Sequence, residues 1–599
     1  MKDTIAVIDL GGQYCHLIKR SLRDIGVQAT IYTDAPSLGV LAEHAGIILS
    51  GGPRSVYEEG APRVDPAIIE LGLPILGICY GHQLLAQMLG AKIERGQGEY
   101  GHNTITLRTE NTIFKGTPPT QSVWMSHGDS ITELPDGLKV LASTEGCETA
   151  AIGDEARRFY GVQFHPEVIH SDYGEQILKN FSRLVCGLEQ EARLEDQVPL
   201  VLDDIRARAG EKSVFFLVSG GVDSTVAFSL CAQALSKERV VGLYVDTGLM
   251  RKGETGELRA NLEALGFIDR FHVREESERF IRALDGVIDP EKKRHIIGRL
   301  FVEVQAEAMR DYGIDEEHWL LGQGTIYPDT IESGGSSGRA AVIKTHHNRC
   351  AEIMELIEKG RVIEPLTEFY KDEVRKLGRA IGLDAELTNR WPFPGPGLAI
   401  RCLCSAEEEA AERLSEHLDG VVRERGFDGI LLPIRSVGVQ GDVRTYRNVA
   451  AIRGPLDCEA LQSLGTTLCN LESAPNRVIY LVAGDEDRLA DARVKKAEIH
   501  EERLALLREA DFIARSMMAE RGLTDSVWQF PVVLIPIALG EGESVVLRPV
   551  NSRDGMTANF ARLPRPVLKQ MADRIRDLRG VDAVFLDVTD KPPATIEWE

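Results

Sequence analysis

The stretch Ser219-Gly220-Gly221-Val222-Asp223-Ser224-Thr225 decides how the middle of this chain folds. It follows the apolar run 215–218 and leads into a helical pattern, which predicts a strand, a glycine-rich turn and the start of a helix. Adjacent glycines let backbone N–H groups close on an anion, and the helix N-terminus adds a positive dipole end. The stretch therefore predicts a phosphate-binding loop. The alternative is a serine-capped glycine turn, which occurs in any α/β protein.

Asp223 requires a separate explanation, because a carboxylate repels phosphates that lie beside it. A divalent cation between the two anions removes this repulsion, so we expect Asp223 to be a Mg²⁺ ligand. The loop lacks the Gly-Lys-Ser/Thr ending of a Walker A motif. It resembles instead the loop of ATP pyrophosphatases, which implies ATP as co-substrate and cleavage between its α- and β-phosphates. The residues expected to contact ATP are Ser219, Gly220, Gly221, Val222, Asp223, Ser224 and Thr225.

Length and charge limit the class of protein. A chain of 599 residues is too long for one hydrophobic core, so several domains are expected. The net charge of −23 argues against binding to nucleic acid or to acidic membranes, and no apolar run is long enough to span a membrane. The start of the chain passes directly into a strand pattern, and its 10 cysteines are irregularly spaced. We therefore expect a cytoplasmic protein with reduced thiols and no structural metal site.

Alternating strand and helix patterns predict a multidomain α/β fold. In the first part the expected strands are 5–10, 47–49 and 75–78, and the expected helices are 17–25 and 83–89. A polar stretch, 189–197, then interrupts the pattern. The second part has expected strands 240–245 and 319–321 and expected helices 254–265 and 300–312, and it ends at Trp391 before Pro392-Phe393-Pro394-Gly395-Pro396-Gly397. The expected domains are 1–190, 198–391 and 392–599.

The last part contains a short internal similarity. Leu431-Leu432-Pro433-Ile434 has a counterpart in Leu534-Ile535-Pro536-Ile537, and strand patterns follow at 449–452 and 545–547. We therefore expect an α+β domain that contains an internal duplication.

A second reactive group lies near the N-terminus. The apolar run 75–78 meets Cys79, which glycines flank, and a helical pattern follows. This is the pattern of a nucleophile elbow, where a helix N-terminus favours the thiolate. His165 and Glu167 supply a base and a carboxylate that fixes its tautomer. Taken alone, a cysteine or a histidine of this kind is more often a core residue.

Together these residues resemble the class I glutamine amidotransferases, over residues 1–190. The resemblance implies a flavodoxin-like domain in which Cys79, His165 and Glu167 release ammonia from glutamine. Backbone amides near Gly52 and Tyr80 are expected to form the oxyanion hole. Gln83 falls where the family contacts glutamine, while His82 and His127 are weaker candidates. A G-x-G-x-x-G pattern at 96–101 is followed by a strand pattern rather than a helix, so it does not predict a dinucleotide site.

Over the whole chain the sequence resembles the glutamine-hydrolysing GMP synthetases, with a pyrophosphatase domain of the adenine-nucleotide alpha-hydrolase type. The matching segments are 245–251, 343–348, 364–366, 371–375, 392–397 and 591–599. The resemblance implies glutamine, ATP and xanthosine 5′-monophosphate (XMP) as substrates. The implied XMP contacts are Arg294, Asp442, Gln529, Lys591 and Glu597. Lys344 and Lys371 are expected to neutralise ATP phosphates, with surface ion pairs as the alternative.

Three further features affect this interpretation. Trp391 stands where the family usually has histidine. The C-terminal domain resembles the long form of the family, which favours a monomer over a homodimer. The basic run 292–295 carries Arg294, although such a run is usually a solvated surface.

Two other functions remain open at this stage. One is a pyrophosphatase-type amidotransferase with another acceptor, as in NAD synthetase. The other is an inactive sensor of glutamine or nucleotide.

Overall fold

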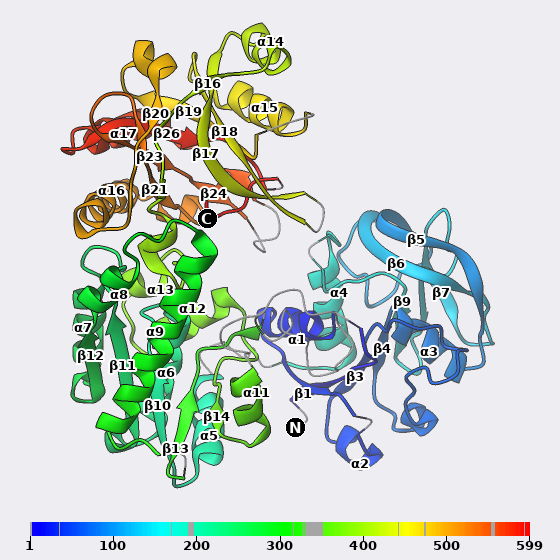
Figure 1. The fold of residues 1–599 in the computed structure, drawn as a ribbon. Coiled ribbons are helices and arrows are strands. Elements are labelled where there is room, and N and C mark those ends of the chain that lie inside the picture. The colour runs from blue at the N-terminus through cyan, green and yellow to red at the C-terminus, as the bar shows by residue number, and fades with distance from the viewer. Residues whose placement is uncertain are drawn as a thin grey trace. The chain divides into compact units, whose positions relative to one another are not determined.

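The computed structural model describes the chain except residues 1–2, 13, 35, 169, 190–196, 316, 328, 330–350, 441–442, 472–474, 553–557 and 592. The described residues form two compact units, one from Met1 to Val198 and one from Pro199 onward. Figure 1 labels most of the elements of both units.

A nine-stranded sheet forms the centre of the first unit, in the order β2-β1-β3-β4-β9-β8-β7-β5-β6. The half from β2 to β9 is parallel and the half from β9 to β6 is antiparallel. The predicted strand 75–78 is confirmed residue for residue as β4. The elements are β1 (Thr4–Ile8), α1 (Cys15–Asp24), β2 (Gln28–Tyr32), α2 (Leu38–Leu41), β3 (Gly46–Leu49), β4 (Ile75–Ile78), α3 (Tyr80–Met88), β5 (Lys92–Leu107), β6 (Thr120–Glu133), β7 (Lys139–Ser143), β8 (Ala151–Asp154), β9 (Phe159–Val162) and α4 (Gly174–Asn180).

Helices pack against both faces of the parallel half. Successive side chains of a strand point to opposite faces of the sheet, so each strand contributes to two cores. In β1, Ile5 and Val7 pack in one core with α1, whereas Ala6 and Ile8 pack in another core with α3. The rejected dinucleotide motif at 96–101 lies within β5, a strand, as expected.

The second unit begins with a five-stranded parallel sheet in the order β12-β11-β10-β13-β14. Its central strand, β10, leads directly to the loop at Ser219. The elements are α5 (Gln197–Ala209), β10 (Ser213–Leu217), α6 (Val222–Ala234), β11 (Val240–Asp246), α7 (Glu254–Ala264), β12 (Phe271–Glu275), α8 (Ser277–Ala283), α9 (Pro290–Asp311), β13 (Trp319–Gly322), α11 (Ala351–Glu358), β14 (Val362–Ile363), α12 (Lys371–Ala380) and α13 (Ala385–Thr388).

Helix α9 corrects one prediction. It begins at Pro290 rather than Leu300. Asp289 accepts a hydrogen bond from the backbone N–H of Lys292 at 2.8 Å, and proline at the first helical position fits the start of a helix. The first turns of α9 are rich in charged residues and do not show the apolar spacing of a helix. The prediction therefore placed the start of the helix too late and did not use the capping signal at Asp289.

The second unit also contains a seven-stranded sheet in the order β16-β17-β18-β19-β26-β23-β21. β17 is antiparallel to β18, which is parallel to β19; in the same way β21 is antiparallel to β23, which is parallel to β26. The two sets meet at the antiparallel pair β19 and β26. The elements are β16 (Glu412–Arg413), α14 (Glu416–Glu424), β17 (Asp428–Gln440), β18 (Val443–Arg453), α15 (Cys458–Cys469), β19 (Arg477–Ala483), α16 (Glu501–Glu520), β21 (Val532–Ile535), β22 (Ile537–Ala538), β23 (Glu543–Leu547), α17 (Arg565–Arg576) and β26 (Val581–Asp587).

The prolines of the two similar motifs occupy comparable positions. The register of β17 shifts between Leu432 and Arg435, around Pro433, and Pro536 separates β21 from β22. Proline lacks the N–H that a sheet ladder requires, so each motif interrupts its strand.

The Pro/Gly segment 392–397 is a shaped loop that packs on the loop after β11. The N–H of Leu398 donates to the carbonyl of Leu249 at 2.7 Å. Gly397 has a φ of +63°, and a Cβ there would lie 2.3 Å from the same carbonyl oxygen. Only glycine fits this close approach.

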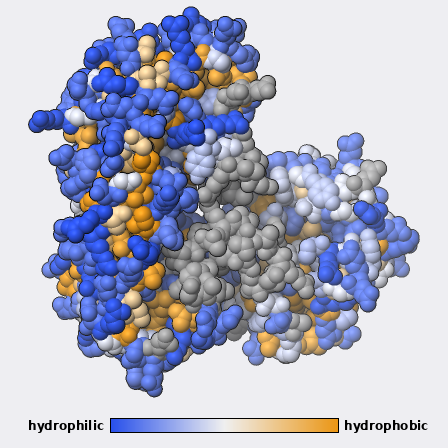
Figure 2. All heavy atoms as spheres, in the orientation of Figure 1, coloured by the Kyte–Doolittle hydropathy of each residue, from blue (hydrophilic) through white to orange (hydrophobic). Residues whose placement is uncertain are grey.

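Hydrophilic side chains dominate the visible face in Figure 2, with smaller apolar areas between them. None of the helices in the described part of the chain is sufficiently long and apolar to span a bilayer.

Candidate functional site

Cys79 lies at the sharp turn between β4 and α3. Its φ of 53° and ψ of −107° are unusual for a residue other than glycine. A Cβ at Gly77 would lie 2.4 Å from the carbonyl oxygen of Gly81, and one at Gly81 would lie 2.2 Å from that of Leu49. Both glycines are therefore required by close packing, and the turn presents the thiol at the start of a helix.

His165 and Glu167 form the pair that the sequence predicted. His165 Nδ1 lies 2.7 Å from Glu167 Oε1. Burial disfavours the imidazolium, but the charge of Glu167 and the hydrogen bond with the Cys79 thiol outweigh it, so the pKa of His165 is raised well above its ordinary value. The ring of Tyr14 packs edge-on against His165 with centroids 5.0 Å apart. The three predicted catalytic residues are thus brought together.

The predicted oxyanion hole lies beside this turn. Tyr80 is the first residue of α3, where backbone N–H groups have no acceptor within the helix. A Cβ at Gly52 would lie 2.8 Å from the carbonyl oxygen of Leu10 and 3.0 Å from the ring of Tyr80, so this loop also needs glycine. The phenol of Tyr80 donates to the carbonyl of Pro62 at 2.6 Å, which leaves only its backbone amide for the predicted role.

Gln83 is buried on α3 and its amide group is already in use. Its Nε2 donates to the carbonyl of Asp129 at 3.0 Å and to Gln163 Oε1 at 2.9 Å. A contact with glutamine therefore stays a prediction. His82 is fully buried, and burial, with a smaller effect of His127, lowers its pKa to about 3. It is therefore neutral at physiological pH.

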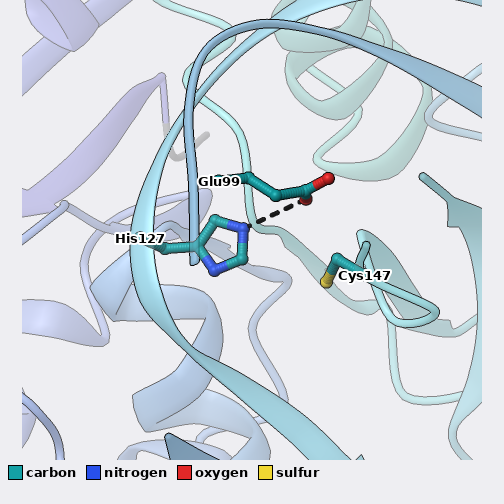
Figure 3. Close-up of side chains that lie close together, drawn as sticks. All are labelled: Glu99, His127 and Cys147. Atoms are coloured by element: carbon teal, nitrogen blue, oxygen red, sulfur yellow. Dashed lines mark hydrogen bonds and ion pairs between the residues drawn. The ribbon is translucent and has the colours of Figure 1, made fainter. Parts of the chain in front are cut away.

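A second group of polar side chains, Glu99, His127 and Cys147, lies in the same unit (Figure 3). Their ligand atoms lie within 4.8 Å of one another. His127 Nε2 lies 3.3 Å from Glu99 Oε2, and Thr144 donates to both oxygens of Glu99 at 2.8 and 2.9 Å. Burial raises the pKa of Cys147, which disfavours the thiolate that a metal binds. Hydrogen bonds alone account for this cluster.

The phosphate loop has the predicted strand, turn and helix. Gly220 has a φ of +79°, and α6 begins immediately after Gly221. The hydroxyls of Ser219 and Ser224 lie 2.9 Å apart, and the hydroxyl of Thr225 donates to the carbonyl of Gly221 at 2.9 Å. The hydroxyls of Ser219, Ser224 and Thr225 are thus hydrogen-bonded within the loop itself.

Asp223 and Lys371, predicted separately, form an ion pair. Lys371 Nζ donates to Asp223 Oδ2 at 2.9 Å, with the two side chains 36% and 22% exposed. Asp223 Oδ1 is buried and has no hydrogen-bond partner among the described residues. A carboxylate oxygen in this state suits a divalent cation, so the residues present fit Mg²⁺.

The sequence marked residues 322–338 as a candidate loop that orders on substrate binding but did not assign them to the ATP site; in the structure the segment after β13 packs on the phosphate loop. A Cβ at Gly324 would lie 2.6 Å from the backbone nitrogen of Ser224. On either side of it, Gln323 Oε1 and Thr325 Oγ1 are buried and have no partner in the described part of the chain. The only sequence signal for this segment was a glycine next to a short strand, a pattern too common to indicate a binding site.

Of the residues assigned to XMP, Gln529 and Glu597 are in direct contact. Gln529 Nε2 donates to Glu597 Oε1 at 3.2 Å. Arg401, which the sequence reading did not select, makes a bidentate pair with Glu597 at 2.6 and 3.0 Å. Arg294 donates to the backbone carbonyl of Glu599.

The other assigned residues are placed less fully. Lys344 and Asp442 lie outside the described residues. The backbone of Lys591 pairs with that of Ala558, through hydrogen bonds of 2.7 and 3.1 Å. Their contacts with ATP or XMP therefore stay predictions.

The basic run 292–295 was interpreted as part of a solvated surface, and this is wrong for Lys293. Its side chain is fully buried and lies 2.6 Å from Glu599 Oε2. It also donates to the carbonyls of Ala399 and Cys402 at 3.2 and 3.3 Å. The start of α9 is therefore tied to the C-terminal segment, because a buried ammonium requires such partners.

Trp391, where the resemblance implies histidine, is buried. Its indole N–H donates to the carbonyl of Thr524 at 3.2 Å, and its ring lies 5.6 Å from that of Phe530. Arg251 donates to the backbone carbonyl of Trp391 at 3.2 Å. The side chain thus anchors the Pro/Gly segment to the C-terminal part.

An elbow cysteine with a His–Glu pair, together with a phosphate loop on a parallel sheet, defines a glutamine amidotransferase joined to an ATP pyrophosphatase. The family models agree with this class. Residues 6–184 match glutamine amidotransferase class-I, residues 195–277 match NAD synthase, and residues 516–598 match the GMP synthase C-terminal domain.

Full-length relatives identify the family. The chain is 42% identical over 605 residues to a Leptospira interrogans protein described as "Probable GMP synthase", with 99% of each chain covered. It is 37% identical to the GMP synthase of Caldicellulosiruptor saccharolyticus, over 100% of this chain and 99% of that one. The GMP synthase of Streptomyces coelicolor is 38% identical, over 100% of this chain and 98% of its own. The chain therefore belongs to the glutamine-hydrolysing GMP synthase family.

Proposed function

We propose that this protein converts XMP, ATP, glutamine and water into GMP, AMP, pyrophosphate and glutamate. The observation that carries the proposal is the relationship to GMP synthases over 99% of the chain. The assembled Cys79–His165–Glu167 group and the phosphate loop with Asp223 support it, because each half of the reaction has its chemical groups in place.

The first half releases ammonia. The Cys79 thiolate attacks the side-chain carbonyl of glutamine, and His165 gives its proton to the leaving nitrogen. The amides of Gly52 and Tyr80 stabilise the oxyanion, while Glu167 holds the imidazole in position. Water then hydrolyses the glutamyl thioester, with His165 as the base, and glutamate leaves.

The second half activates XMP. O2 of the xanthine base attacks the α-phosphorus of ATP, pyrophosphate leaves, and ammonia then displaces AMP at C2. Residues 219–225 and Lys371 hold the pyrophosphate oxygens, since helix N-termini and ammonium groups both stabilise anions. Lys344 is assigned to the same phosphates, and Arg294, Asp442, Gln529, Lys591 and Glu597 to XMP.

Mg²⁺ would complete the proposed ATP site. Asp223 would be its ligand, because Oδ1 is buried and has no partner within the described region. A cation bound there would supply positive charge beside the pyrophosphate oxygens. Lys371 pairs with Oδ2 of the same carboxylate.

The seven-stranded sheet supports an internal duplication. Each half has an antiparallel strand pair, a helix and a parallel third strand: β17, β18, α15 and β19 in one, and β21, β23, α17 and β26 in the other. We propose that the two copies pair with each other through β19 and β26, so that the protein is a monomer. Light scattering after size-exclusion chromatography tests this, and the mass of a dimer would contradict it.

The function itself is tested by pyrophosphate release from Mg-ATP and ammonium. XMP is compared with IMP, nicotinate adenine dinucleotide and no acceptor. Release that depends on XMP and is accompanied by GMP is the expected result. Release with another acceptor would support the two catalytic activities but would show that GMP is not the product. No release from folded protein would favour a sensor.

A further inference from the structure

Arg251 is a buried arginine in the loop between β11 and α7. Its side chain is 5% exposed. Nη1 donates to the backbone carbonyl of Trp391 at 3.2 Å, and Nη2 donates to that of Pro392 at 3.4 Å. The guanidinium also lies 4.3 Å from the ring centroid of Phe393. One side chain thus ties the start of the Pro/Gly segment 392–397 to the loop that follows β11.

The same loop reaches the phosphate loop through Glu254. The backbone N–H of Arg251 donates to Glu254 Oε2 at 3.1 Å. Glu254 is buried, and a Cβ at Gly220 would lie 3.5 Å from its Oε1. Arg390 Nη1 lies 3.6 Å from the same oxygen. Glu254 is therefore packed beside the phosphate loop, where it cannot move independently of its neighbours.

On the other side, the Pro392 carbonyl is shared with a residue assigned to XMP. Gln529 Nε2 donates to this carbonyl at 3.2 Å and to Glu597 Oε1 at 3.2 Å. A carbonyl oxygen has two lone pairs, so it can accept from Arg251 and from Gln529 at once. A continuous path of contacts therefore runs from Glu254 through Arg251 and Pro392 to the residues assigned to XMP.

The position of Arg251 depends on the Pro/Gly segment. Burial lowers the pKa of Arg251 to about 10, although the charges of Asp511 and Glu254 act in the opposite direction. Asp511 Oδ2 lies 3.8 Å from Arg251 Nε, which has no hydrogen-bond partner among the described residues. Within the described part of the chain, the guanidinium donates hydrogen bonds only to the carbonyls of Trp391 and Pro392. A displacement of this segment would therefore also displace the guanidinium.

We propose that Arg251 is a positioning residue that couples the binding of ATP to the binding of XMP. A ligand that fixes either end of the path also fixes the Pro392 carbonyl, so the second ligand loses less conformational freedom when it binds. By linkage, each ligand then tightens the binding of the other by the same factor. This inference rests on the function proposed above.

The test measures binding to the full chain by isothermal titration calorimetry with Mg²⁺. The ligands are XMP and α,β-methylene-ATP, an analogue that cannot release pyrophosphate. In the wild type, saturating XMP should lower the Kd for the analogue about fivefold or more. In Arg251→Met this factor should fall below about twofold, while the Kd for each ligand alone stays within about threefold of the wild type.

A second variant, Arg251→Lys, keeps a positive charge beside Asp511 and Glu254. It should show the same loss of coupling, because its ammonium lacks the planar fork that donates to both carbonyls. This variant keeps the inference testable if Arg251→Met does not fold.

Arg508→Met is the matched control. From α16, Arg508 donates to the carbonyl of Met250 at 3.3 Å and to that of Gly248, both in the same loop as Arg251. It makes no contact with Glu254 or Pro392 among the described hydrogen bonds. The control variant removes an arginine that holds this loop but leaves the path intact, so it should keep the wild-type factor.

Three results would overturn the inference. Equal losses in Arg251→Met and Arg508→Met would show that any loosening of the loop is sufficient. An unchanged factor in the Arg251 variants would show that the path carries no coupling. A wild-type protein that binds both ligands without any mutual effect would remove the coupling itself. A wild-type protein that binds the ATP analogue but not XMP would instead refute the proposed function.

Discussion

The two reactive regions are built in different ways. In the glutaminase region the reacting groups act on one another: His165 lies 2.7 Å from Glu167, and both Glu167 and Cys79 raise the pKa of His165. In the synthetase region the charged groups pair with each other instead, as in Lys371 with Asp223 and Arg401 with Glu597. Each of these pairs leaves one buried polar atom without a partner in the described structure, as the His165–Glu167 pair also does at Glu167 Oε2.

This difference follows from the chemistry. Covalent catalysis needs a nucleophile and a base whose geometry the protein alone fixes. A nucleotide site instead needs several charges, and charges at low exposure require counter-charges before the ligand arrives. We therefore propose that the ion pairs of the second region occupy the places of ligand charges. Asp223 Oδ1, which is buried and has no hydrogen-bond partner among the described residues, is the proposed position of the cation.

Replacement of the nucleophile should separate the activities of the two regions most clearly. We expect Cys79→Ala to reduce glutamine-dependent GMP synthesis by at least about 10⁴-fold, because no thioester can form. Synthesis from ammonium should be unchanged, since the second region does not use Cys79. Both activities are measured by GMP formation at saturating XMP and ATP.

Cys147→Ala is the matched control for this prediction, because Cys147 is also a buried thiol of the first unit, with a pKa raised by burial. It should retain glutamine-dependent activity. If Cys79→Ala folds but loses the ammonium reaction as well, the division of labour is wrong.

Asp223→Asn should affect both nitrogen donors alike. The amide keeps the size of the side chain but removes the charge that holds the proposed cation, so adenylylation should slow by about 10²-fold or more with either donor. Pyrophosphate release from ATP at several Mg²⁺ concentrations is the measurement.

Asp203→Asn serves as the control, since Asp203 pairs with Arg206 on the exposed face of α5. It should behave as wild type. Unchanged pyrophosphate release by Asp223→Asn at low Mg²⁺ would remove the metal assignment.

Glu167→Gln should have a smaller effect, limited to the glutaminase. Glu167 raises the pKa of His165, so its neutral replacement lowers that pKa. We expect glutaminase activity to fall by about 10²-fold, and the limb of its pH profile that His165 titrates to move to lower pH. Glutamate release measured between about pH 5 and 10 gives both values.

The second Glu–His pair of the unit offers a control. Glu99 lies 3.3 Å from His127 and makes no contact with His165 among the described hydrogen bonds. Glu99→Gln should leave the position of this limb unchanged. A shift toward higher pH in Glu167→Gln would refute the proposed pairing.

The sequence predicted features that depend on local pattern. The elbow at Cys79 and the loop at Ser219 each need glycines next to a strand and a helix, and these letters are contiguous. Residues that act through distant contacts were missed. Arg401 meets Glu597 only because the C-terminal segment packs beside the Pro/Gly segment, and no local pattern encodes that pairing. The burial of Lys293 was missed for the same reason.

The smallest effect is expected at Trp391, where the resemblance and the structure suggest different roles for the side chain. The resemblance favours histidine at this position, whereas the structure gives the indole a packing role, with its ring 5.6 Å from that of Phe530 and its N–H bonded to Thr524. Trp391→His should therefore lower the free energy of unfolding by about 1–3 kcal/mol, because a smaller ring leaves the pocket partly empty. It should change kcat by less than about threefold, because the catalytic groups of both regions lie elsewhere. Urea unfolding and ammonium-dependent GMP synthesis measure the two effects. A large gain or loss of activity without a stability change would mean that this side chain takes part in the reaction rather than in anchoring the segment.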